Sequence, residues 1–151
     1  MIFSEREFEA ILADPSKIIE GDLKWTEDED KSPTLKFRVE VQSEPGYPLF
    51  ISASCNRALP ALTYSLIHRG VGRIYGLCYG KDHHNPACER VGDKHKHRWT
   101  DLYKDKQAHI PSDITAAAND PVLVWRQFCA EAKIRHQGQI ESPPLLQEVL
   151  F

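Results

Sequence analysis

Alternating apolar and polar residues are the feature that most constrains the fold of this chain. In residues 34–42, TLKFRVEVQ, an apolar side chain falls at every second position and polar ones lie between. A period of two is typical of a β-strand with one buried and one wet face. Comparable segments lie at residues 18–25, 48–55, 61–70, 73–80 and 95–103. Because Pro- and Gly-containing turns separate several of them, we expect an antiparallel meander in which the last two segments pair as a hairpin.

Two helices are predicted, one before and one after the strand-rich region. Ser4 and Glu7 form a capping box, and Pro15 ends the first helix. Asp120 as N-cap and Pro121 at the first position open the second helix. Its apolar side is predicted to comprise Val122, Trp125, Phe128, Cys129 and Ala132. The order predicts an α+β fold, with both helices on one face of a curved antiparallel sheet of about five to six strands.

The size and charge of the chain bound its organisation and partners. Its 151 residues, 41% hydrophobic and 27% charged, fit one globular domain, which we expect at residues 1–134. An extended tail is predicted at residues 135–151, where apolar residues suit a homodimer arm or a protein-binding surface. The net charge of −3 provides no overall positive field for nucleic acid. Since no apolar run approaches the roughly 20 residues of a spanning helix, we expect a cytoplasmic protein without a membrane partner.

Histidine clustering is the strongest functional signal. Four of the seven histidines, His83, His84, His95 and His97, lie within one stretch of the chain. On a strand, His95, His97 and Trp99 would point to one face, while Lys96 and Arg98 would point to the other. The loop before this strand can fold His83 back over the pair. Cations also concentrate at residues 90–106, which predicts a local basic patch on an otherwise acidic chain.

Acid–base catalysis without a cofactor is the leading hypothesis for this cluster. Imidazoles with a pKa of about 6.5 can exchange protons with a ribose 2′-hydroxyl and a leaving 5′-oxygen. In this hypothesis His83, His95 and His97 are the general acid and base, and Arg73 or Arg98 stabilises the developing charge. RNA would be bound by Arg98, Lys96 and Trp99. The chain would then be a small, toxin-like phosphodiesterase acting on RNA.

Two other hypotheses use the same residues. A structural or hydrolytic zinc site could consist of His83, His95 and His97 with a water, or of Cys78 and Cys88 with the His95–His97 pair. The nine residues between Cys78 and Cys88 differ from the short spacing of a standard zinc knuckle. Alternatively, the chain is a non-enzymatic interaction protein, such as a phage inhibitor of a host defence factor, and its histidines form a solvated polar face.

From residue 73 onward the chain resembles a family of small, uncharacterised bacterial and phage proteins with a His-x-Asn-Pro segment, a His-x-His segment and a C-terminal helix. The matching residues, within 73–134, are His83-His84-Asn85-Pro86, His95-Lys96-His97 and the helix DPVLVWRQFCAEAKI. This resemblance implies roles for His83, Asn85, His95 and His97, with Asn85 holding the loop or binding a phosphate oxygen. The family pattern continues Asn-Pro-Asp-Gly, whereas this chain has Ala87-Cys88, so the resemblance assigns no role to Cys88.

Overall fold

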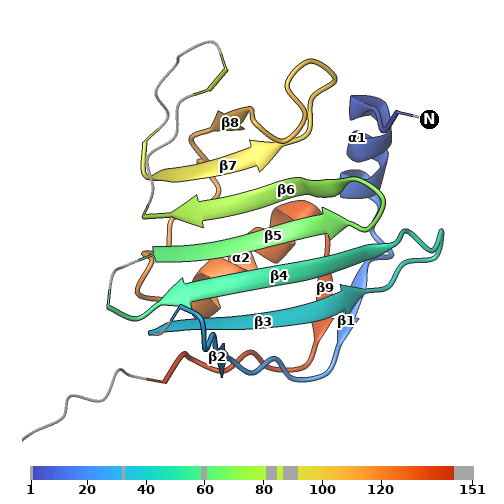
Figure 1. The fold of residues 1–151 in the computed structure, drawn as a ribbon. Coiled ribbons are helices and arrows are strands. Elements are labelled where there is room, and N and C mark those ends of the chain that lie inside the picture. The colour runs from blue at the N-terminus through green and yellow to red at the C-terminus, as the bar shows by residue number, and fades with distance from the viewer. Residues whose placement is uncertain (1, 32, 59–60, 81–84, 87–91, 145–151) are drawn as a thin grey trace, which may run out of the picture.

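The alternating segments form one antiparallel sheet of seven strands, in the order β2 to β8 (Figure 1). The computed structural model describes residues 2–31, 33–58, 61–80, 85–86 and 92–144. The strands of this sheet are β2 (Thr26–Glu27), β3 (Thr34–Val41), β4 (Leu49–Asn56), β5 (Ala61–His68), β6 (Gly72–Tyr79), β7 (Lys94–Arg98) and β8 (Ala108–His109).

The strand predictions are confirmed in the centre of the sheet and fail at its margins. The two-residue strands β2 and β8 raise the count above the expected five to six. The single strand predicted over residues 18–25 is wrong, because only β1 (Ile18–Glu20) forms there and β2 begins after it, at Thr26. Between them Gly21 adopts a φ of +97°, which turns the chain. β1 leaves the meander and pairs in parallel with β9 (Arg135–Gln137), so the predicted tail begins with a strand.

The two helices begin at the predicted caps and lie on the same face of the sheet. Ser4 Oγ accepts from the Glu7 amide at 3.1 Å, at the start of α1 (Glu5–Ala13). Asp120 caps α2 (Pro121–Ala132), which lies behind the sheet in Figure 1. Val124 replaces the predicted Val122 on its buried side, because residues 121, 124, 125, 128 and 132 follow the helical period. Neither helix is long enough to span a bilayer.

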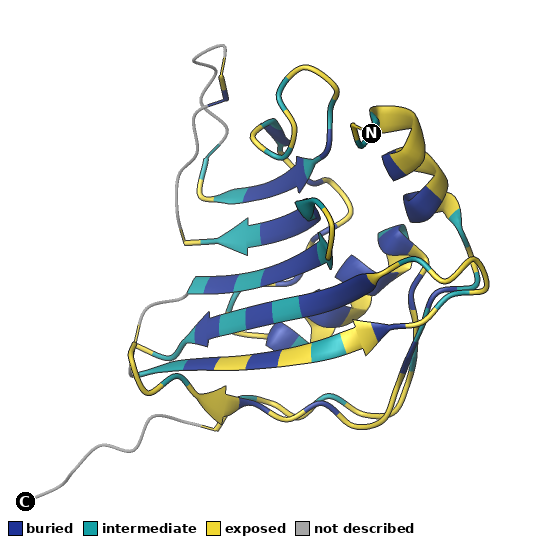
Figure 2. Ribbon diagram, turned by 45° about the vertical axis from the view of Figure 1, so that its right-hand side comes forward, coloured by how far each residue is buried: buried dark blue, intermediate teal, exposed yellow. Residues whose placement is uncertain are grey.

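The covered face of the sheet holds the core, and the opposite face carries polar side chains. Figure 2 shows the alternation on β3, where Leu35 and Phe37 are buried and Lys36 and Arg38 are exposed. Aromatic rings join the sheet to α2: the centroids of Tyr75 and Phe128 lie 5.1 Å apart. Since apolar burial is the main driving force of folding, this layer fixes which face of every strand looks inward.

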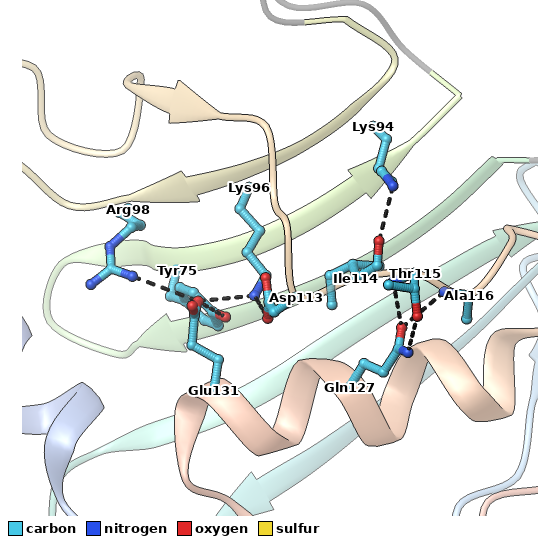
Figure 3. Close-up of polar contacts among 10 residues, drawn as sticks. All are labelled: Tyr75, Lys94, Lys96, Arg98, Asp113, Ile114, Thr115, Ala116, Gln127 and Glu131. Carbon is cyan, nitrogen blue, oxygen red and sulfur yellow. Dashed lines mark hydrogen bonds and ion pairs between the residues drawn. The ribbon is translucent and has the colours of Figure 1, made fainter.

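A charged cluster interrupts the core between β7 and α2 (Figure 3). Lys96 is fully buried, and its ammonium group donates to Glu131 Oε1 at 2.9 Å and to Asp113. The Tyr75 hydroxyl donates to the same Glu131 oxygen at 2.5 Å, and Arg98 lies 3.6 Å from it. Burial alone would raise the pKa of Glu131, but hydrogen bonds from Tyr75 and Lys96 and the nearby positive charges hold it below its usual value. The cluster therefore keeps a charged lysine inside the protein.

Replacing Glu131 by Gln is expected to lower the free energy of unfolding at neutral pH by about 1.5–3 kcal/mol, because two buried donors lose a charged acceptor. A carboxyl whose pKa is lowered by folding stabilises the protein above its ordinary pKa of 4.5, and this stabilisation is lost as pH falls through the folded-state value. Urea unfolding should therefore separate the variant from the wild type at about pH 7 and show a smaller difference between them at about pH 3.

The exposed Glu20 of β1 provides a matched control. Glu20→Gln should change the free energy of unfolding by less than about 0.5 kcal/mol at either pH. Equal losses in the two variants would contradict the importance of the Glu131 hydrogen bonds.

Candidate functional site

Two cross-strand rows of small polar residues lead to the histidines on the uncovered face. The backbone register pairs Ser54 with Thr63, Thr63 with Cys78, and Cys78 with His95. The neighbouring row runs through Ser52, Ser65, Gly76 and His97. As predicted, His95 and His97 share one face of β7, and Lys96 points to the other. Cys78 reaches the histidines because the hairpin of β6 and β7 places it directly opposite His95.

Cys78, His95 and His97 form a group whose geometry suits a metal ion. One ligand atom from each side chain lies within 4.8 Å of the others. The two imidazole rings have centroids 4.9 Å apart and are inclined by 75°, and each histidine is at most 4% exposed. Thiolate sulfur and neutral imidazole nitrogen are the donors that zinc prefers in proteins. The group is the Cys–His–His part of one of the ligand sets predicted from the sequence.

Backbone carbonyls orient both imidazoles. His95 Nδ1 lies 3.0 Å from the Gly92 carbonyl oxygen, and His97 Nδ1 lies 2.8 Å from the Asp105 carbonyl oxygen. A carbonyl oxygen only accepts, so Nδ1 is the protonated nitrogen of each ring, and Nε2 of the neutral ring carries the lone pair. Protein metal sites orient their histidine ligands with this same type of hydrogen bond. Both rings are thus held in a tautomer that can bind a metal through Nε2.

Arg73 brings positive charge to this cluster. One guanidinium nitrogen lies 3.9 Å from Cys78 Sγ, and another pairs with the Asp105 carboxylate at 3.2 Å. A Cβ atom at Gly76 would come within 3.0 Å of Arg73 Cδ, so the glycine leaves room for this side chain to cross the sheet surface. Asp105 therefore contributes twice, since its carboxylate pairs with Arg73 and its carbonyl accepts from His97.

The cluster borders a cavity of about 570 Å³ on the uncovered face. Of the residues that the structure describes, three cations, Lys31, Arg73 and Lys106, contribute to its lining, against one carboxylate, Asp28. The strand hydroxyls of Ser54 and Thr63 also line it. The histidines therefore face a polar, cation-rich cavity that is large enough for a small ligand.

The structure brings four of the predicted site residues together and separates the others. Arg73, Cys78, His95 and His97 meet at the cavity. Lys96 and Arg98 instead contact Glu131 on the covered face, and Trp99 packs on Phe3 at a ring-centroid distance of 5.3 Å. The cations of residues 90–106 accordingly lie on two faces and form no single patch among the described residues. The predicted His83, with His84, Cys88 and Arg90, falls outside the described residues.

Asn85 holds the chain that precedes β7 to the edge strand β8. Its side-chain nitrogen donates to the Ala108 carbonyl at 2.9 Å, and its side-chain oxygen accepts from the Ala108 amide at 2.8 Å. The side chain is buried and does not contribute to the lining of the cavity. Of the two roles that the resemblance implied, these contacts match loop holding.

Several residues of the site were absent from the sequence prediction. Lys31 and Asp28 come from the turn before β3, and Asp105 and Lys106 come from the turn between β7 and β8. Sequence spacing gives no sign that these turns approach β6. The small polar residues of β4 and β5 did carry a signal, because they alternate with buried apolar ones.

The other two described cysteines, Cys55 and Cys129, are buried, and burial raises the pKa of both thiols.

Comparison with protein-family models shows that the chain belongs to a family of unknown function, DUF6978, which matches residues 3–134. The match covers both helices and the whole seven-stranded sheet. It includes the N-terminal region that the sequence resemblance left out. Comparisons with curated proteins and with solved structures give no match.

Replacing Asn85 by Ala is expected to lower the free energy of unfolding by about 2 kcal/mol, because two buried hydrogen bonds to Ala108 are lost. Urea unfolding measures the change, and the exposed Asn119, replaced by Ala, is the matched control. The control should lose less than about 0.5 kcal/mol. An Asn85→Ala protein as stable as the wild type would show that the amide does not hold this loop.

Proposed function

We propose that Cys78, His95 and His97 bind one zinc ion and that this ion is the centre of a hydrolase active site. The convergence of three zinc-type donors within 4.8 Å, beside a cavity of about 570 Å³, is the observation that supports the proposal. Three protein ligands converge among the residues that the structure describes, and three ligands with a water molecule are typical of catalytic zinc, whereas structural zinc is bound by four protein ligands.

The chemistry follows from the charges around the donors. A zinc-bound water has a pKa of about 7, so it supplies hydroxide near neutral pH. The hydroxide oxygen would form a bond to the electrophilic atom of an ester, and the ester oxygen would leave and take a proton from water. Arg73 lies next to Cys78, where its guanidinium group can stabilise negative charge on the reacting group. The Asp105 carboxylate positions Arg73 for this role.

Metal-free acid–base catalysis by the same imidazoles is the competing mechanism. In an in-line displacement at phosphorus, the attacking and leaving oxygens lie on opposite sides. The acid and the base must therefore approach from opposite sides as well. His95 and His97 instead lie on the same strand face and gather around Cys78, an arrangement better suited to one shared ion. A phosphodiesterase reaction on RNA remains compatible with the zinc mechanism, with the metal in place of the general base.

Protein purified without added metal is expected to contain about one zinc ion per chain, and both Cys78→Ser and His95→Ala should remove it. Elemental analysis measures the content. A chelator should also lower the melting temperature of the wild type, because an ion that binds only the folded state stabilises it. His109→Ala, in a histidine of β8 that is outside the cluster, is the control and should retain the ion. Metal-free wild type that cannot be loaded with zinc would overturn the proposal.

The pH dependence of hydrolysis separates the two mechanisms. With the dinucleotide uridylyl-3′,5′-adenosine as substrate, which carries the ribose 2′-hydroxyl that the acid–base mechanism needs, the rate of the zinc-loaded protein should rise with pH through about 7 and then level off, as the bound water ionises. Acid–base catalysis by two histidines would give a bell-shaped profile that survives chelation. His97→Ala should abolish the activity in either mechanism, which makes it the control for contaminating hydrolases.

A further inference from the structure

We infer that the uncovered face of the sheet binds single-stranded nucleic acid through its phosphates, with one phosphodiester placed beside Arg73. This inference deepens the proposed function, because it names the substrate class of the same site. It is carried by the distribution of charge and by the shape of the polar face.

The cavity itself favours an anion. Among the described residues its lining contains three cations, Lys31, Arg73 and Lys106, and one carboxylate, Asp28. With Asp105, which pairs with Arg73 at its edge, positive charges still exceed negative ones by one, on a chain whose net charge is −3. The hydroxyl-bearing side chains of Thr34, Ser54 and Thr63 add neutral hydrogen-bond donors. Apart from Tyr79, none of the described residues that line the cavity has a large apolar side chain. A phosphate group can accept hydrogen bonds from these donors and pair with the positive charges, whereas an apolar ligand cannot.

Cations extend from the cavity across the sheet to β3. Lys36 and Arg38 are exposed on this strand, and the register places them beside Ser54 and Ser52 of the polar rows. Three strand intervals separate β3 from β6, the strand that carries Arg73, which is about 14 Å at the usual spacing. One phosphate cannot contact both ends of this surface. A chain with several phosphates can place one at Arg73 and others along β3.

A stacking platform lies on the same face. The Arg38 guanidinium group lies 3.8 Å from the centroid of the Phe50 ring, and the Arg69 guanidinium group lies 4.9 Å from it. Unpaired bases stack on arginine planes of this kind. The Glu40 carboxylate, which also belongs to this face of β3, is paired with Arg69. Base stacking requires bases that are free of a duplex, so the platform favours a single strand.

The test measures binding of fluorescein-labelled uridine and adenosine decamers to the full chain by fluorescence anisotropy, in chelator so that no zinc-dependent cleavage occurs. Phosphate contacts carry no sequence information, so the two decamers should bind with similar affinity. The double variant Lys36→Gln, Arg38→Gln should bind about tenfold or more weakly and should reduce the salt dependence of binding by about two phosphate contacts. Arg126→Gln, in an exposed residue of α2, is the matched control and should bind as the wild type does.

Three results would overturn the inference. They are an absence of binding, equal binding by the double variant and the wild type, and competition by uridine monophosphate at the same molar concentration as an unlabelled decamer. The last result would indicate a ligand with a single phosphate. Circular dichroism of each variant checks that it is folded. Binding in chelator does not depend on zinc. A wild type that cannot be loaded with zinc but binds the decamers would therefore refute only the zinc proposal, and a zinc-containing protein that does not bind them would refute only this inference.

Discussion

The buried ammonium group of Lys96 is the constraint on which the candidate site depends. A charge inside a protein is costly unless it is paired, and here Glu131 and Asp113 pair with it from outside the strand. A shift of β7 by one residue would remove Lys96 from these carboxylates and place an imidazole in the core. The pairing therefore specifies one orientation of the strand. His95 and His97, on either side of Lys96, must then face the uncovered side.

The same sheet serves as a scaffold on one face and as a binding surface on the other. Aromatic residues of β5, β6 and α2 fill the covered side, where the ring centroids of Tyr64 and Trp125 lie 5.1 Å apart. On the uncovered side of β5 and β6, the residues that alternate with these aromatic ones are small, as Ser65 and Gly76 show. Because Gly76 has no side chain, Arg73 can lie across the strand toward Cys78. A rigid packed layer thus positions a polar site on its reverse face.

The turn between β7 and β8 links the charged Arg73 side chain to the orientation of His97. Asp105 pairs with Arg73 through its carboxylate and accepts from His97 through its carbonyl. An anion that attracts Arg73 would therefore also act on Asp105, whose carbonyl orients the His97 imidazole. In the proposed function, substrate recognition and the arrangement of the zinc ligands are linked through this single residue.

Sequence periodicity by itself determined the meander, the two capped helices and the shared face of His95 and His97, because these depend on local backbone geometry. It could not determine that β1 pairs with β9, since that contact joins residues more than a hundred positions apart. The sequence prediction placed Lys96, Arg98 and Trp99 at the substrate site. In the structure Lys96 and Arg98 contact α2, and Trp99 packs on the N-terminal segment. Only the tertiary structure decided these partners, and only it brought the turns carrying Lys31 and Asp105 to the histidines. Which turns meet above a sheet depends on long-range packing, and no period in the sequence encodes it.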